Sequence, residues 1–186
     1  MANIYDVANF FIELAGQDDE GEITNLKLNK LLYYAQGHYL AALNKPLFTE
    51  AIEAWDLGPV IPAIYQKYKI CGKNSIAAEG KDIAENFSDE EYSFLLDIAR
   101  EYGKYTAAYL VNKTHEPDSP WAQTNRNEVI NIEQIAAYFS ANERIKPFKI
   151  KLNDSKNIAI GHRDSEGFLV LPADENDDYW DNYNEA

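Results

Sequence analysis

The sequence predicts a mainly α-helical protein with a single compact multi-helix domain, a small C-terminal β-hairpin and an acidic tail. Several segments repeat apolar residues at helical spacing behind residues that cap helix N-termini, whereas apolar and polar residues alternate near residue 160. A chain of 186 residues has room for one full hydrophobic core. We therefore expect a helical domain over residues 1–145, a β-hairpin extension over 146–173 and an acidic aromatic tail over 174–186.

The first two helices are predicted between residues 4 and 44. Asn3 can cap the first helix and Gly16 can end it. Thr24 can cap the second helix, which ends near Asn44, before Pro46. The apolar stripes of the two helices consist of Ile4, Val7, Ala8, Phe11, Leu14 and Ala15, and of Leu28, Leu31, Leu32, Ala35, Tyr39 and Ala42.

The region over residues 48–72 is predicted to turn and then to form a short helix. The pattern FTEAIEAWDLGPVIP, from Phe48 to Pro62, has two prolines, a glycine and no helical period, which favours an extended or turning segment. Pro62 suits the first turn of a helix over residues 63–70, and Gly72 is placed to end that helix.

Two further helices are predicted before the loop THEPDSPW. Ser88 and Glu91 form a capping-box pattern at the start of the first of them, and Gly103 is placed to end it. A shorter helix over residues 106–112 leads into the loop. The buried face of the longer helix is expected to consist of Tyr92, Leu95, Leu96, Ala99 and Tyr102.

A last helix, a hairpin and a tail complete the predicted order of elements. Asn131 and Gln134 repeat the capping pattern, and the helical domain ends near Arg144. Ile158 and Ile160 then alternate with polar or small residues, RDSEG supplies turn residues, and FLVL is a second strand-like run, so we expect a hairpin. From residue 174 the chain holds six acidic residues, no basic residue and three aromatic residues. We expect a charged, flexible tail.

Charge and cysteine content restrict the classes of function. The chain has 17 Lys and Arg against 31 Asp and Glu, a net charge of −14, which disfavours nucleic acid and anionic membrane surfaces and favours basic protein partners. The same charge also fits an ordinary acidic soluble protein. Cys71 is the single cysteine, which excludes an intramolecular disulfide. With no signal-peptide pattern and no apolar run of membrane-spanning length, we expect a cytoplasmic protein.

The sequence contains no pattern that requires catalysis or a bound metal. HExxH, GxSxG and Cys-x-x-Cys are absent, and CGKNS is not a phosphate-binding loop because Lys67 stands where that loop needs glycine. His115, Glu116 and Asp118 offer metal-binding atoms, but neighbouring loop residues make a poor cage. A role for His115 in fixing its loop is favoured. We expect a protein that is not an enzyme and has no cofactor or metal.

The tyrosines of the second helix are candidates for a binding surface. Tyr33, Tyr34 and Tyr39 lie on both sides of this helix, so we expect at least one of them to point away from its main apolar stripe, and an exposed tyrosine there would be an interface candidate. Because tyrosine is a favoured anchor of protein interfaces, Tyr33 and Tyr34 are candidate contacts for a partner protein. The alternative is that they fill the core.

Three runs of the sequence resemble a known family. KLNKLLYYAQGHYLAALNKPLF, EAWDLGPVIPAIYQKYK and THEPDSPW occur in this order and are together similar to the Panacea domain, also called the SocA-like or phage-associated GepA-type antitoxin domain. The resemblance covers residues 4–139. Glycine and proline can fix a turn, and tryptophan supplies apolar area, so we expect the matching positions to be mainly structural. They include Trp55, Gly58, Pro59, Tyr65, His115, Pro120 and Trp121.

The resemblance implies an antitoxin. Members of the family are mostly helical proteins encoded beside a toxin gene, often on prophages, and their toxins include small alarmone synthetases and other blockers of translation. At least one member resembles an adaptor that presents its toxin to the Clp protease. The resemblance thus implies a type II toxin-antitoxin system in which this chain neutralises its cognate protein toxin by direct binding, with a Clp-type protease as a further candidate partner.

The C-terminal part, from Lys146 onward, departs from the family pattern. Its tail is a candidate toxin-binding segment, because carboxylates can occupy phosphate positions in a basic nucleotide-binding cleft while aromatic rings contact apolar surface. A solubilising, disordered tail explains the same composition equally well. The candidate residues are Asp177, Asp178, Tyr179, Trp180 and Tyr183.

An alternative function is an acidic phage-type decoy. In this class of inhibitor, surface carboxylates imitate the phosphates of DNA and block a nucleic-acid-binding enzyme. Regularly spaced surface acids would favour such a decoy, whereas acids concentrated in the tail would not.

Overall fold

The computed structural model describes residues 1–17, 23–142, 162–163 and 169–170. The chain divides into two compact units, Met1–Phe148 and Lys149–Ala186. Within the described residues the first unit is mainly helical, as predicted. Its elements are α1 (Ile4–Ala15), α2 (Asn25–Leu43), β1 (Glu53–Trp55), β2 (Gly58–Val60), α3 (Pro62–Tyr68), short 3-10 helices at Lys69–Cys71 and Ala84–Asn86, α4 (Asp89–Tyr102), α5 (Ala107–Thr114) and α6 (Ile132–Asn142).

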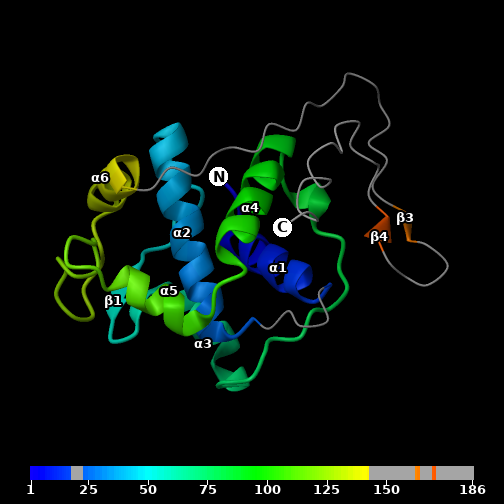
Figure 1. Ribbon diagram of the computed structural model, residues 1–186, viewed down its shortest axis with the longest axis horizontal. Coiled ribbons are helices and arrows are strands. Elements are labelled where there is room, and N and C mark those ends of the chain that lie inside the picture. The colour runs from blue at the N-terminus through cyan, green and yellow to red at the C-terminus, as the bar shows by residue number, and fades with distance from the viewer. Residues whose placement is uncertain (18–22, 143–161, 164–168, 171–186) are drawn as a thin grey trace, which may run out of the picture. The chain divides into compact units, whose positions relative to one another are not determined.

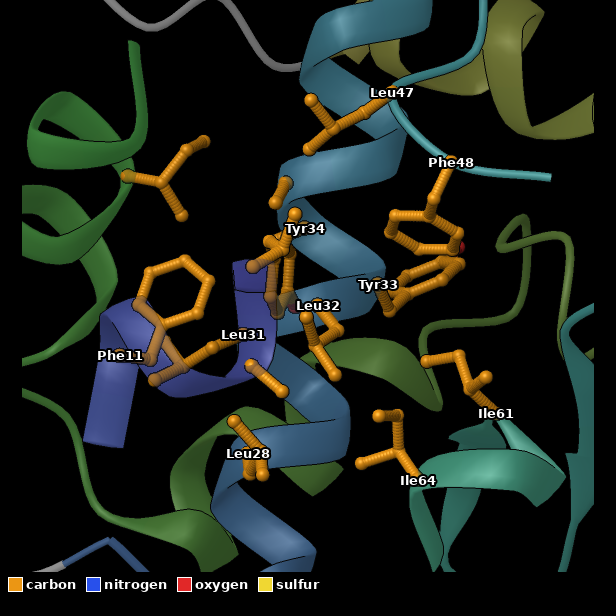
Figure 2. Packing of buried hydrophobic residues seen from close by; sticks show 14 of the residues in the cluster. Phe11, Leu28, Leu31, Leu32, Tyr33, Tyr34, Leu47, Phe48, Ile61 and Ile64 are labelled. Atoms are coloured by element: carbon orange, nitrogen blue, oxygen red, sulfur yellow. The ribbon is translucent and has the colours of Figure 1, made fainter. Parts of the chain in front are cut away.

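Helix α2 is the central element of the first unit. Figure 1 shows it between α6 on one side and α1 and α4 on the other, and it also contacts α3 and α5. Every residue from Leu28 to Leu40 is buried. The core side chains therefore lie on both sides of this helix, with Phe11 on one side and Phe48 on the other in Figure 2. A helix that is covered all round is a core helix rather than a surface helix.

The predicted helix termini are confirmed by the hydrogen bonds that cap them. Asn3, Thr24 and Ser88 each accept a hydrogen bond from a backbone N–H in the first turn of α1, α2 and α4. Glu91 completes the capping box of α4. Helix α2 ends at Asn44, which adopts the left-handed conformation with φ of 52°. These ends depend on contacts between near neighbours in sequence, which is why the sequence alone identifies them.

The predicted turning segment forms a β-hairpin. Strands β1 and β2 pair antiparallel, with Glu53 opposite Val60 and Trp55 opposite Gly58. Two residues, Asp56 and Leu57, connect the strands. Pro62 then begins α3, which ends at Tyr68, two residues before the predicted end. A 3-10 turn over Lys69–Cys71 follows and is capped by Gly72.

The candidate tyrosines of α2 are buried and are therefore not surface contacts for a partner. Tyr33, Tyr34 and Tyr39 are 1%, 2% and 3% exposed. The ring of Tyr33 packs edge-on against Phe139 of α6, and the ring of Tyr34 stacks on Tyr102 of α4 with the centroids 4.1 Å apart. Because neighbouring helices cover both sides of α2, Tyr33 and Tyr34 belong to the core and are not accessible to a partner.

The described part of the second unit is one antiparallel strand pair, β3 (His162–Arg163) and β4 (Leu169–Val170). Strand β4 lies within the predicted strand FLVL. Ile158 and Ile160, expected in the first strand, lie outside the described residues, and so does the tail over residues 174–186. Among the described helices of the whole chain, none has both the length and the apolar character of a membrane span.

Candidate functional site

The residues of the family pattern converge at the β1–β2 hairpin. The carbonyl oxygen of Trp55 accepts hydrogen bonds from Nε1 of Trp121 at 2.8 Å and from Nη1 of Arg126 at 2.9 Å. The ring of Trp121 packs against His115 with the centroids 3.7 Å apart, and the ring of Trp55 packs against Tyr65 at 4.8 Å. Segments separated by more than 50 residues in sequence are thus joined at the hairpin.

Gly58 lies where the hairpin comes closest to its neighbours. Its φ of +96° favours glycine, and a Cβ atom at this position would lie 2.6 Å from Oγ1 of Thr114 and 2.9 Å from Cε of Lys30. The next residue, Pro59, accepts a hydrogen bond through its carbonyl oxygen from Nζ of Lys30 at 2.8 Å. A side chain at position 58 would therefore push the hairpin away from both α2 and α5.

Hydrogen bonds within the loop hold the segment that contains His115 and Trp121. Ser119 and Pro120 are buried. Oγ of Ser119 donates to the carbonyl oxygen of Thr114 at 2.7 Å, and Oγ1 of Thr124 donates to the carbonyl oxygen of Pro120 at 2.7 Å. These bonds close the loop on itself, so the Trp121 side chain is held against the hairpin.

Lys30 is a buried lysine that no pattern in the sequence indicates. It is 0% exposed, and its Nζ donates to Pro59 from the second turn of α2. Burial lowers the pKa of Lys30 from its usual 10.5 to about 7, because removing the ammonium group from water disfavours the charged form. The pKa of His115 is also lowered, first by desolvation and then by the positive charge of Lys30, against an opposing hydrogen bond with the backbone of Asp56.

Two asparagines of α2 join this helix to the start of α3, and no pattern in the sequence indicates this role. Oδ1 of Asn29 accepts a hydrogen bond from the backbone N–H of Ile61 at 2.9 Å. Nδ2 of Asn25 donates to the carbonyl oxygen of Tyr65 at 3.1 Å, and Nδ2 of Asn29 donates to Oδ1 of Asn25. A polar residue next to an apolar stripe is usually solvated, so only its tertiary neighbours identify this role.

An open groove of about 710 Å³ lies beside the hairpin. The first turns of α2 and α5, the hairpin, α3 and the turn that follows α3 form its walls. Leu57, at the hairpin turn, is 57% exposed at this groove. The charged residues that line the groove are Asp56, Lys69 and Lys73. Its large apolar lining residues are Leu26, Trp55, Leu57, Val60 and Tyr65.

The chemistry of the groove is that of a surface that binds an apolar side chain. Aromatic and aliphatic walls release water when an apolar group fills them, and a concavity of this volume is in the usual range for binding pockets. In the part of the chain that the structure describes, no three His, Cys, Asp or Glu side chains are grouped to hold a metal ion. The candidate residues of the tail, Asp177 to Tyr183, lie outside the described residues.

Comparisons with known proteins match the same region. A family model described as "Antitoxin SocA-like, Panacea domain" matches residues 28–122. Antitoxin SocA of Caulobacter vibrioides (strain NA1000 / CB15N) is 31% identical over 125 residues, which cover 62% of this chain and 66% of that relative. No solved structure matches. The matched range begins in α2 and ends just after Trp121, so it contains the hairpin, the loop and most of the groove.

Proposed function

Because the chain belongs to the SocA-like antitoxin family with a Panacea domain, we propose that it is the antitoxin of a type II system and neutralises a cognate protein toxin by direct binding. The similar protein from Caulobacter vibrioides is named an antitoxin. The hairpin groove is the surface that we assign to toxin binding.

The observation that carries this assignment is an exposed apolar residue on a hairpin that hydrogen bonds from other parts of the chain hold in place. Leu57 is exposed at the groove, while the adjoining strands are held by Lys30, Trp121 and Arg126. Exposed apolar groups beside a concavity are typical of protein interaction sites. A preorganised hairpin also loses little conformational entropy when it binds, which favours affinity.

The acidic aromatic tail forms a second part of the proposal. Its carboxylates at Asp177 and Asp178 would contact a basic cleft of the toxin, and Tyr179, Trp180 and Tyr183 would contact apolar or base-stacking surface there. A toxin that binds nucleotides, such as a small alarmone synthetase or another translation inhibitor, has a cleft of this kind. The support for this part is the composition of the tail, with six acidic and three aromatic residues.

Co-expression with the toxic gene product encoded beside this chain tests the proposal. We expect the chain to restore growth and to form a complex with the toxin that survives size-exclusion chromatography. A chain truncated before Asp174 tests the tail separately, because full neutralisation by the truncated chain would remove the tail from the mechanism. Restored growth without any complex between the two purified proteins would contradict direct binding.

Delivery of the toxin to a Clp-type protease is a distinct version of the proposal. It predicts that the half-life of the toxin falls when the chain is present, and that this effect disappears in a strain that lacks the protease. A toxin whose half-life is unchanged while growth is restored would show that binding alone suffices.

A further inference from the structure

The groove beside the hairpin is built from parts of the chain that lack acidic residues. Residues 23–49, 57–78 and 102–115 contain no Asp or Glu, although the whole chain has 31. These three runs hold eight of the 17 Lys and Arg residues. They also supply every lining residue of the groove except Trp55, Asp56 and Asn127. The groove thus has a local charge opposite to that of the chain as a whole.

The charged side chains that line the groove give it a positive local charge. The carboxylate of Asp56 lies 3.4 Å from Nε of Arg126, so a neighbouring cation offsets its charge. Lys69 and Lys73 are exposed and form no ion pair with any residue in the described ranges. Two ammonium groups are therefore available among the residues that line an apolar groove.

We propose that this groove binds an acidic segment of the toxin in which one or two large apolar residues are flanked by Asp or Glu. The inference depends on the proposed antitoxin function and adds the chemistry of the partner. The apolar residue would contact Leu57, Trp55 and Tyr65, and the flanking carboxylates would face Lys69 and Lys73. A basic segment would meet like charges in this groove, and charge complementarity governs which segment docks and in which orientation.

A cross-linking experiment identifies the occupant directly. A benzophenone-bearing residue placed at Leu57 of the full chain, irradiated with the purified toxin and analysed by mass spectrometry, reports which toxin residues contact the groove. We expect cross-links to an apolar residue with at least two Asp or Glu close by in sequence. Cross-links to a Lys- or Arg-rich toxin segment, or to residues 174–186 of the chain itself, would overturn the inference.

Reversing the charges of the two groove lysines provides a second test, which does not require the benzophenone-bearing residue at Leu57. We expect the double change Lys69→Glu and Lys73→Glu to weaken toxin affinity by at least about tenfold at low salt, with a smaller loss at high salt. Lys45→Glu is the matched control, since this exposed lysine follows the far end of α2, which lies roughly 21 Å along the helix from the groove residue Asn29 at a rise of 1.5 Å per residue. Reversing the cross-linked toxin carboxylates to Lys is expected to restore affinity to the doubly reversed chain.

The two proposals fail in different ways. If the unmodified chain binds the toxin but the reversed chain binds it equally well, the acidic-segment inference is wrong and the antitoxin function stands. If the unmodified chain does not bind the toxin at all, both are wrong.

Discussion

Two grooves in the first unit differ in how their polar groups are used. The second groove, of about 570 Å³, lies beside α1 and is lined by residues that include Phe10, Glu13 and Lys81. There the carboxylate of Glu13 accepts hydrogen bonds from the backbone N–H groups of Glu79 and Gly80, each at 2.9 Å. Lys81 pairs with Glu79. The second groove therefore joins the chain to itself, while the hairpin groove presents Leu57 and two lysines outward.

The difference shows that a concave surface alone does not identify a binding site. The two grooves have similar volumes. What separates them is the availability of their groups: polar atoms that are satisfied internally favour folding, whereas exposed apolar area and unpaired charge favour a partner. Substitutions that act on one groove and not on the other test this distinction.

The largest effect on stability is expected for Gly58→Ala at the hairpin. The added Cβ would clash with Thr114 and Lys30, and the positive φ is unfavourable for alanine, so we expect a loss of about 3 kcal/mol in the free energy of unfolding. Gly72→Ala is the matched control, because Gly72 also has a positive φ but no atom lies within 4 Å of the position that a Cβ would take there. Its backbone, with φ of 58° and ψ of −118°, is strained for alanine, so we expect urea denaturation to show a loss of about 2 kcal/mol, which is smaller than at Gly58 because no clash is added. Equal losses would mean that the close approach at Gly58 is unimportant.

The lowered pKa of Lys30 makes the stability of the folded chain depend on pH. The pKa is about 7 in the folded chain and 10.5 in the reference state, so between these values the unfolded chain binds more protons and stability rises with pH. Below pH 7, Lys30 is protonated in both the folded and the unfolded chain, so this contribution to stability is lost. From pH 7 to pH 9 the gain is at most about 2.7 kcal/mol, at 1.36 kcal/mol per pH unit.

Denaturation curves of Lys30→Met at both pH values isolate this contribution. The variant lacks the titrating group, so its stability relative to the unmodified chain should fall as the pH rises. Lys45→Met, at an exposed lysine, should keep the original slope. Parallel pH profiles for the unmodified chain and Lys30→Met would show that Lys30 titrates normally.

A charge placed on Leu57 should affect binding and leave folding unchanged. We expect Leu57→Asp to weaken toxin affinity by about 2 kcal/mol, or roughly 30-fold, because an interface anchor is replaced by a solvated carboxylate. The side chain is 57% exposed, so the free energy of unfolding should change by less than about 0.5 kcal/mol. Leu43→Asp, at a leucine that is 46% exposed at the end of α2, is the control and should bind normally. Isothermal titration calorimetry measures the toxin affinity of both variants. If Leu57→Asp bound the toxin as tightly as Leu43→Asp, the groove would be excluded from the interface.

The smallest effect is expected at the second groove. Glu13→Gln keeps one oxygen acceptor but removes the negative charge that strengthens two hydrogen bonds, so we expect a loss of about 1 kcal/mol in stability. Toxin affinity should not change. A loss of affinity in a folded Glu13→Gln variant would mean that the second groove also contacts the toxin.

The helices themselves follow from short-range patterns in the sequence. Asn3, Thr24 and Ser88 cap helices as expected because each interacts with backbone atoms two or three residues away. The burial of α2 on both sides does not follow from such short-range patterns. A stripe of apolar residues predicts one buried face, but α2 is covered on both sides, so Tyr33, Tyr34 and Lys30 are all buried.

The candidate site was predictable only in part. The resemblance identified Trp55, Gly58, His115 and Trp121, and the structure brings these residues together at the hairpin. Leu57 carries no signal in sequence, since a single leucine in a turn is common and becomes informative only beside a groove. The net charge predicted basic partners. Net charge is an average over the whole surface, however, and it conceals the positive groove.

The amino-acid sequence by itself determined the helical class, the helix ends, the acidic net charge and the family pattern, because these depend on composition and on residues close together in the chain. Tertiary structure alone decided which side chains are accessible, why Lys30 titrates near neutral pH, and that three separate runs without acids meet at one surface. Burial and local charge are set by neighbours that lie far away in sequence, and only folding brings those neighbours together.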